Sequence, residues 1–107
     1  DLNEYSKQLK NRWPDIEISS EDDPNAYYIL HWRIRSENYD MDGSLNRTLQ
    51  VIRLHGDFSA LAEFAIWYRS LIPLDYKLIF YDDLYYFHVY LEKGTTTDEL
   101  IQNYKAE

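Results

Sequence analysis

The sequence predicts a small α+β domain, with a single antiparallel sheet of four to five strands, helices packed on one face and the element order α-β-β-β-α-β-β-α. Apolar residues recur at helical spacing in three segments, and between these segments aromatic and β-branched residues alternate with polar ones, as in half-buried strands. The chain has 107 residues, is 45% hydrophobic and contains 11 Tyr, 4 Phe and 3 Trp. These side chains suffice for one core, whereas two halves would each be too small for a stable one, so residues 1–107 are expected to form a single domain.

The first predicted helix covers residues 2–13, where apolar side chains are spaced by three or four positions: Leu2, Tyr5, Leu9 and Trp13. Pro14 follows and cannot continue the helix, because its ring removes a backbone donor and clashes with the preceding turn. We expect this helix to cover a sheet. Residues 15–18 then alternate acidic and isoleucine side chains, which indicates a short edge strand before an acidic turn at residues 21–25.

A stronger strand is predicted over residues 27–35. One set of alternate residues is apolar and is expected to face the core: Tyr28, Leu30, Trp32 and Ile34. The other set points to the opposite face: Tyr27, Ile29, His31, Arg33 and Arg35. This strand is therefore expected to have one buried face and one face that carries a histidine and two arginines.

Residues 36–54 are expected to form a long hairpin, with a polar turn over 36–44 and a strand over 45–54 whose inward face cannot be assigned from the alternation. Residues 38–46 also resemble part of a calcium loop, because oxygen-bearing side chains alternate and Gly43 stands at the sixth position. The twelfth position, however, is Leu49 where an EF-hand has a glutamate, and the flanking segments indicate strands. A plain turn at Asp42-Gly43 is the favoured interpretation, and a calcium-responsive loop is the alternative.

A central helix is predicted over residues 58–71, after Gly56-Asp57 ends the strand and before Pro73. Its apolar positions recur at helical spacing: Phe58, Leu61, Phe64, Ala65, Tyr68 and Leu71. Ile66 and Trp67 widen this apolar face. We therefore expect the helix to be covered on more than one side, by the sheet and by another helix or subunit.

Residues 76–91 are the most aromatic part of the chain and predict a β-hairpin, with the acidic pair Asp82-Asp83 as its turn. In the second strand, alternate residues are expected to face the core: Tyr85, Phe87, Val89 and Leu91. The residues between them then form an outer face that is aromatic and able to form hydrogen bonds: Tyr86, His88 and Tyr90. Such a face is typical of a contact surface.

A short last helix is predicted after Gly94, which breaks the strand. Thr96 and Glu99 match a capping box, in which each side chain accepts a hydrogen bond from the backbone N–H of the other residue. The apolar positions of this helix follow directly: Leu100, Ile101 and Tyr104.

Several kinds of chemistry lack the residues that they need. Cysteine is absent, which excludes disulfides, Cys-ligated zinc and thiol catalysis and fits a reducing compartment, so a cytoplasmic location is expected. The three glycines cannot supply a Walker or Rossmann phosphate loop, and the three histidines lack metal-ligand spacing. No apolar run approaches the roughly 20 residues of a membrane helix. We therefore expect no metal, no cofactor and no membrane partner.

The chain is acidic, with a net charge of −8 from 19 acidic and 11 basic residues. Its average field repels phosphate, which argues against a nucleic-acid partner. The same field favours a basic protein partner, although an acidic excess also serves solubility.

The candidate site combines the outer faces of two predicted strands. If these strands are neighbours, one sheet face gathers a His, Arg and Tyr cluster: His31, Arg33, Arg35, Tyr86, His88 and Tyr90. Such a cluster could hold a protein partner or an acidic ligand, or perform general acid–base chemistry, because histidine titrates near neutral pH and arginine binds carboxylates. A solvated sheet face or a dimer interface is the alternative.

The leading functional hypothesis is a non-enzymatic cytoplasmic module, expected to be a homodimer, that binds a protein partner through the aromatic sheet face or the apolar face of the helix over 58–71. It could be an inhibitor of immunity type or could capture an apolar segment. In element order alone, the arrangement is similar to the small acidic chaperones of bacterial secretion systems, and this resemblance transfers no functional residue. The alternative is a small-ligand or enzymatic site built from the same His, Arg and Tyr cluster.

Overall fold

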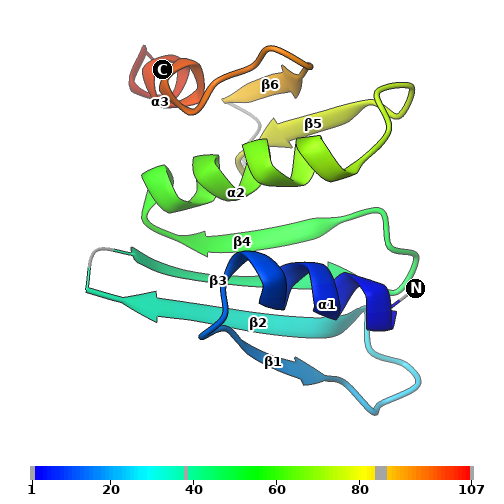
Figure 1. Ribbon diagram of the computed structural model, residues 1–107. Helices are drawn as coiled ribbons and strands as arrows, with labels where there is room; N and C mark the ends of the chain where they lie inside the picture. The colour runs from blue at the N-terminus through cyan, green and yellow to red at the C-terminus, as the bar shows by residue number, and fades with distance from the viewer. Residues whose placement is uncertain (1, 38, 84–86, 107) are drawn as a thin grey trace. The chain divides into compact units, whose positions relative to one another are not determined.

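The computed structural model describes residues 2–37, 39–83 and 87–106. Within these ranges, three helices and six strands follow in the order α-β-β-β-β-α-β-β-α (Figure 1). The α+β class and the antiparallel pairing are confirmed, with one strand more than the sequence predicts. The strands form a four-stranded sheet and a separate two-stranded sheet, and the chain divides into two compact units, residues 1–57 and 58–107.

The first unit consists of one helix, α1 (Leu2–Arg12), and the four-stranded sheet. The strands of this sheet lie in sequence order: β1 (Glu17–Ser20), β2 (Tyr28–Ser36), β3 (Tyr39–Asn46) and β4 (Ile52–Gly56). The helix, blue in Figure 1, lies across one face of this sheet. Its Tyr5 ring contacts the ring of Trp32, with centroids 6.2 Å apart. The predicted covering helix is thus confirmed, and it ends before Pro14 as expected.

The covered face of the sheet carries the core of the first unit. The buried residues of β2 include three of the four that the alternation predicts: Leu30, Trp32 and Ile34. Met41 and Leu45 of β3 are fully buried and lie opposite Ile34 and Leu30. Gly43 stands opposite Trp32, and a Cβ at this position would fall 2.5–2.6 Å from the indole ring. Glycine therefore leaves the space that the indole occupies.

The polar turn predicted over residues 36–44 is wrong. Residues 39–46 form β3, and the connection to β4 lies at residues 47–51 instead. The mistake arises because Asp42-Gly43 resembles a turn. In the structure, Asp40 and Asp42 are exposed and alternate with buried Met41 and Gly43, as in a strand with one packed face. Apart from Asn38, which lies outside the described residues, the calcium-like segment is extended strand rather than the curled loop of an EF-hand.

Tyr28 is the exception in β2, because the prediction that it faces the core is wrong. The register between β2 and β3 shifts between Tyr28 and Leu30, and this irregularity places Tyr28 opposite Asn46. Residues directly opposite each other share a face, so Tyr28 joins the polar face of the sheet. The guanidinium of Arg53 lies over the Tyr28 ring, 4.4 Å from its centroid, in agreement with this placement.

The turn between β3 and β4 is held by one asparagine. The Asn46 side-chain oxygen accepts hydrogen bonds from the backbone N–H groups of Gln50 and Val51, both at 2.9 Å. Leu49 within this turn has a φ of 63° and is 41% exposed. A left-handed leucine is unusual, because only glycine and asparagine adopt this conformation at little cost.

The second unit consists of two helices and the two-stranded sheet: α2 (Phe58–Leu71), β5 (Leu78–Tyr81), β6 (His88–Leu91) and α3 (Thr97–Ala106). Its core joins buried residues of both helices and of β6: Ala62, Ala65, Leu91 and Leu100. An aromatic cluster adds to this core, where the Phe58 ring stacks on Tyr104 at 4.0 Å and lies 5.7 Å from Phe80. The helix predicted over 58–71 is confirmed at both ends.

The predicted aromatic hairpin is confirmed in β5 and β6, which pair only with each other within the described sheets. Phe87 and Leu91 are buried and Val89 packs against the core, as the alternation predicts, whereas Tyr85 lies outside the described residues. Asp82 closes the hairpin, since its carboxylate accepts a hydrogen bond from the Phe87 N–H at 3.1 Å.

The capping box at the start of α3 is confirmed. The Thr96 hydroxyl accepts from the Glu99 N–H at 3.1 Å, and the Glu99 carboxylate accepts from the Thr96 N–H at 3.3 Å. These bonds satisfy backbone donors that the first turn of a helix leaves without an intrahelical partner.

Replacing Thr96 with alanine is expected to lower the free energy of unfolding by about 1 kcal/mol, because the side-chain acceptor of the cap is lost. Urea unfolding followed by circular dichroism measures this change. Thr97→Ala, one residue further into α3, is the control and is expected to change stability by no more than about 0.5 kcal/mol. Equal losses in both variants would contradict the role of the cap.

Candidate functional site

The structure divides the predicted site residues between two sheets. His31, Arg33 and Arg35 lie in β2, which is hydrogen-bonded to β1 and β3, whereas His88 and Tyr90 lie in β6, which pairs with β5. Tyr86 lies outside the described residues. The strand adjacency on which the combined cluster depended therefore does not occur, and partner binding by these residues stays a prediction.

His31 and Arg33 instead belong to a polar face of the four-stranded sheet, opposite the core. Two rows of residues in register cross all four strands on this face. The first row is Ser19, His31, Ser44 and Arg53, and the second row is Glu17, Arg33, Asp42 and His55. Arg35 opposite Asp40 starts a third row. We call these residues, together with Tyr28, the polar sheet face.

A depression of about 490 Å³ lies on the polar sheet face. Its lining includes all four residues of the first row and three of the second: Ser19, His31, Ser44, Arg53, Glu17, Arg33 and Asp42. His31 Nδ1 and the Ser44 hydroxyl form a hydrogen bond of 2.8 Å, and Ser44 is 7% exposed. The predicted His and Arg cluster therefore has partners from β3 and β4 rather than from β6.

In the second unit, the outer face of the hairpin carries His88 and Tyr90 as the alternation predicts. Tyr81 lies opposite His88, and Ile79 lies opposite Tyr90. Both tyrosines are exposed. This face is aromatic and bears hydrogen-bonding groups, a composition common in protein interfaces.

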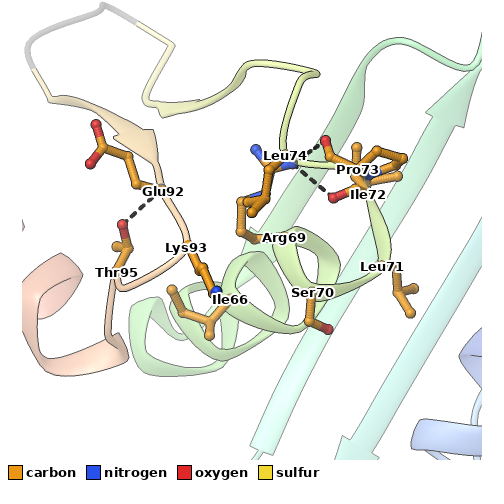
Figure 2. Close-up of a pocket in the computed structure, with 10 residues that line it drawn as sticks. All are labelled: Ile66, Arg69, Ser70, Leu71, Ile72, Pro73, Leu74, Glu92, Lys93 and Thr95. Carbon is orange, nitrogen blue, oxygen red and sulfur yellow. Dashed lines mark hydrogen bonds between the residues drawn. The ribbon is translucent and has the colours of Figure 1, made fainter.

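A second hollow, the helix-end pocket, lies where α2 ends, and Figure 2 shows its lining: Ile66, Arg69, Ser70, Leu71, Ile72, Pro73, Leu74, Glu92, Lys93 and Thr95. Its volume is about 500 Å³. Two leucines of the lining are partly open to solvent, with exposed fractions of 39% for Leu71 and 57% for Leu74. The pocket therefore combines five aliphatic side chains, two of which a second molecule can reach, with five polar or charged ones.

Arg69 gives this pocket a rigid wall. Its side chain is buried and donates to four carbonyl oxygens, those of Ile72 at 2.8 Å, Pro73 at 2.7 Å, Tyr76 at 2.9 Å and Leu91 at 3.2 Å. Figure 2 shows the bonds to Ile72 and Pro73. The guanidinium thus satisfies carbonyls at the negative end of α2 and ties the following loop to the end of β6.

Neither Arg69 nor the pocket is evident from the sequence pattern. Arg69 stands between Tyr68 and Ser70 near the end of an apolar helix, where a basic residue usually indicates a solvated last turn. The single signal is that Pro73 follows closely, so the chain must turn while several carbonyls still need donors.

The hydroxyl groups of the pocket serve local turns. Thr95 Oγ1 accepts from the Glu92 N–H at 2.8 Å, and the Ser70 hydroxyl donates to the Trp67 carbonyl. Neither hydroxyl is thereby paired with a base, which a serine or threonine nucleophile needs.

None of the helices within residues 2–37, 39–83 and 87–106 has the length and apolar character to cross a membrane. Nor do three or more His, Asp or Glu side chains gather as metal ligands in those parts of the chain.

Comparisons with protein families, with curated proteins and with solved structures each found no match to this chain. What the protein does is therefore inferred from its own residues.

Proposed function

We propose that the chain is a non-enzymatic module that binds a protein partner, and that the helix-end pocket receives an apolar side chain of that partner. The observation that carries this proposal is the exposure of Leu71 and Leu74, which line a pocket of about 500 Å³ together with other aliphatic residues and with polar ones. Removing such side chains from water is favourable by about 25 cal/mol per Å² of apolar surface. Pockets that accept an apolar anchor dominate the energetics of many interfaces.

Two further properties support a protein partner. The four hydrogen bonds of Arg69 hold the loop after α2 in place, so little conformational entropy is lost when a partner binds. The net charge of −8 attracts a partner segment with basic residues beside its apolar anchor. Apolar contact supplies most of the affinity in this proposal, and charge increases the rate of association.

Replacing Leu74 with serine is expected to weaken partner binding about tenfold or more, because an apolar contact of the pocket margin is lost and tenfold corresponds to about 1.4 kcal/mol. The measurement is affinity capture from the source lysate by the purified wild-type and variant proteins, at low and at high salt. The captured protein is then titrated against each variant by calorimetry.

Leu49→Ser is the matched control, since Leu49 is also an exposed leucine but lies in the turn between β3 and β4. We expect it to retain the same partner as the wild type. Capture that is equal for the Leu74 and Leu49 variants, or no retained protein at all, would contradict the proposal. A dimer in light scattering that Leu74→Ser dissociates would identify a second copy of the chain as the partner.

A further inference from the structure

The two rows of the polar sheet face differ in charge. The first row, Ser19, His31, Ser44 and Arg53, contains hydrogen-bond donors and one arginine but no carboxylate. The second row contains two carboxylates, Glu17 and Asp42, and one arginine between them, Arg33. With histidine neutral, the first row has a net charge of one positive unit and the second a net charge of one negative unit. The face is therefore dipolar.

Both charges border one hollow. The depression of about 490 Å³ is lined by residues of both rows, and this volume lies within the range of small-molecule sites. Along a strand, residues on the same face are two positions apart, or about 6.6 Å. A ligand in the depression can therefore reach both rows when its opposite charges are several ångströms apart.

The first row is organised for a carboxylate. The Ser44 hydroxyl lies in register between His31 and Arg53 and is hydrogen-bonded to the His31 ring. Arg53 is oriented by its packing on the Tyr28 ring. A hydroxyl, an imidazole and a guanidinium from three adjacent strands thus border the depression, and a carboxylate can accept hydrogen bonds from such groups.

The second row is suited to a cation. Asp42 and Glu17 are both exposed and stand directly across from Arg33 on its two sides. Arg33 compensates one of the two carboxylates, which leaves one negative charge for an ammonium group. The same carboxylates repel a polyanion, so the site selects against phosphate-rich ligands.

We infer that the depression on the polar sheet face binds a small zwitterion, an ω-amino acid or a short peptide, with its carboxylate at His31, Ser44 and Arg53 and its ammonium group at Asp42 and Glu17. This site lies in the first unit and is independent of the partner pocket. It gives the protein a ligand of its own in addition to a protein partner.

Three probes of similar length test the inference in amide NMR titrations of the whole chain: 4-aminobutanoate, butanoate and butylammonium. 4-Aminobutanoate is expected to bind at least tenfold more tightly than either singly charged probe and to shift amides of residues 17–19, 31–33, 42–44 and 53. Arg53→Gln is expected to reduce its affinity to that of butylammonium. Asp42→Asn is expected to reduce it to that of butanoate.

Arg35→Gln and Asp40→Asn are the controls, because Arg35 in β2 and Asp40 in β3 lie on the same face of the sheet but outside the depression. Both are expected to bind 4-aminobutanoate as the wild type does. All four substituted side chains are exposed, so the variants are expected to keep the fold, which their amide spectra verify. Equal affinity for the three probes, equal losses in the control variants, or the lack of a saturable shift would overturn the inference.

Discussion

Replacing Arg69 with methionine is expected to lower the free energy of unfolding by about 4 kcal/mol, the largest stability effect of any single change that we propose. The substitution keeps much of the side-chain volume but removes donors to four carbonyl oxygens. The bond to the Leu91 carbonyl is buried, and the other three are partly buried. Each carbonyl left without a donor carries a desolvation penalty of about 1–3 kcal/mol. Urea unfolding followed by circular dichroism and fluorescence measures the loss.

Lys105→Met provides the control for this experiment. Lys105 is likewise a basic residue in the last turn of a helix, α3, but its side chain is exposed. We expect this variant to stay within about 0.5 kcal/mol of the wild type. If Arg69→Met costs less than about 1 kcal/mol, the guanidinium does not hold the loop after α2, and the rigid wall of the helix-end pocket has another origin.

The second large effect is expected at Gly56, where alanine should cost about 3 kcal/mol or more. Gly56 is the last residue of β4 and has a backbone φ of 141°, which L-residues with a side chain rarely adopt. A Cβ there would overlap the backbone oxygen of Asp40 and lie 2.8 Å from the Met41 Cα. These are backbone atoms of β3, so a side-chain rotation cannot relieve the overlap. Thermal unfolding of the variant measures the effect.

Gly94→Ala is the matched control. A Cβ at Gly94 meets nothing within 4 Å, and its φ lies outside the range that disfavours side chains. Alanine there is expected to be neutral or to stabilise the protein slightly, by up to about 1 kcal/mol, because it restricts the unfolded chain. Similar losses at Gly56 and Gly94 would show that the close approach of β4 to β3 is not the cause.

Local patterns predict much of this fold. The helices over 2–13 and 58–71 and the capping box at Thr96 follow from spacing and end signals within a few residues. Strand alternation predicts the buried faces of β2 and β6 as well, because one face of each strand is packed and the other is polar.

The errors arise where tertiary structure overrides the local signal. Gly43 resembles a turn residue, but it lies within β3 because the Trp32 indole on the neighbouring strand occupies the space of its side chain. Tyr28 follows the apolar alternation of β2, yet the register shift after it places it on the other face. Neither the indole contact nor the register shift can be read from neighbouring residues.

The candidate site shows the same limit. The polar face of His31 and Arg33 follows from alternation within one strand, but Ser44 and Arg53 reach it only through the pairing of β2 with β3 and of β3 with β4. The alternation within residues 45–54 does not show which side chains face the core. It therefore does not predict on which face of the sheet Arg53 lies. Pairing between distant strands also assigns His88 and His31 to different sheets, and no local pattern specifies this pairing.

Arg69 also has a consequence for the order of events in folding. Its bond to the Leu91 carbonyl joins residues 22 positions apart, so it can form only after β6 has been placed beside the end of α2. An interaction that forms after the folding barrier has been crossed slows unfolding and leaves the folding rate nearly unchanged. We expect the part of the Arg69 contribution that comes from the Leu91 bond to slow unfolding rather than to speed folding, and so to lengthen the lifetime of the native state.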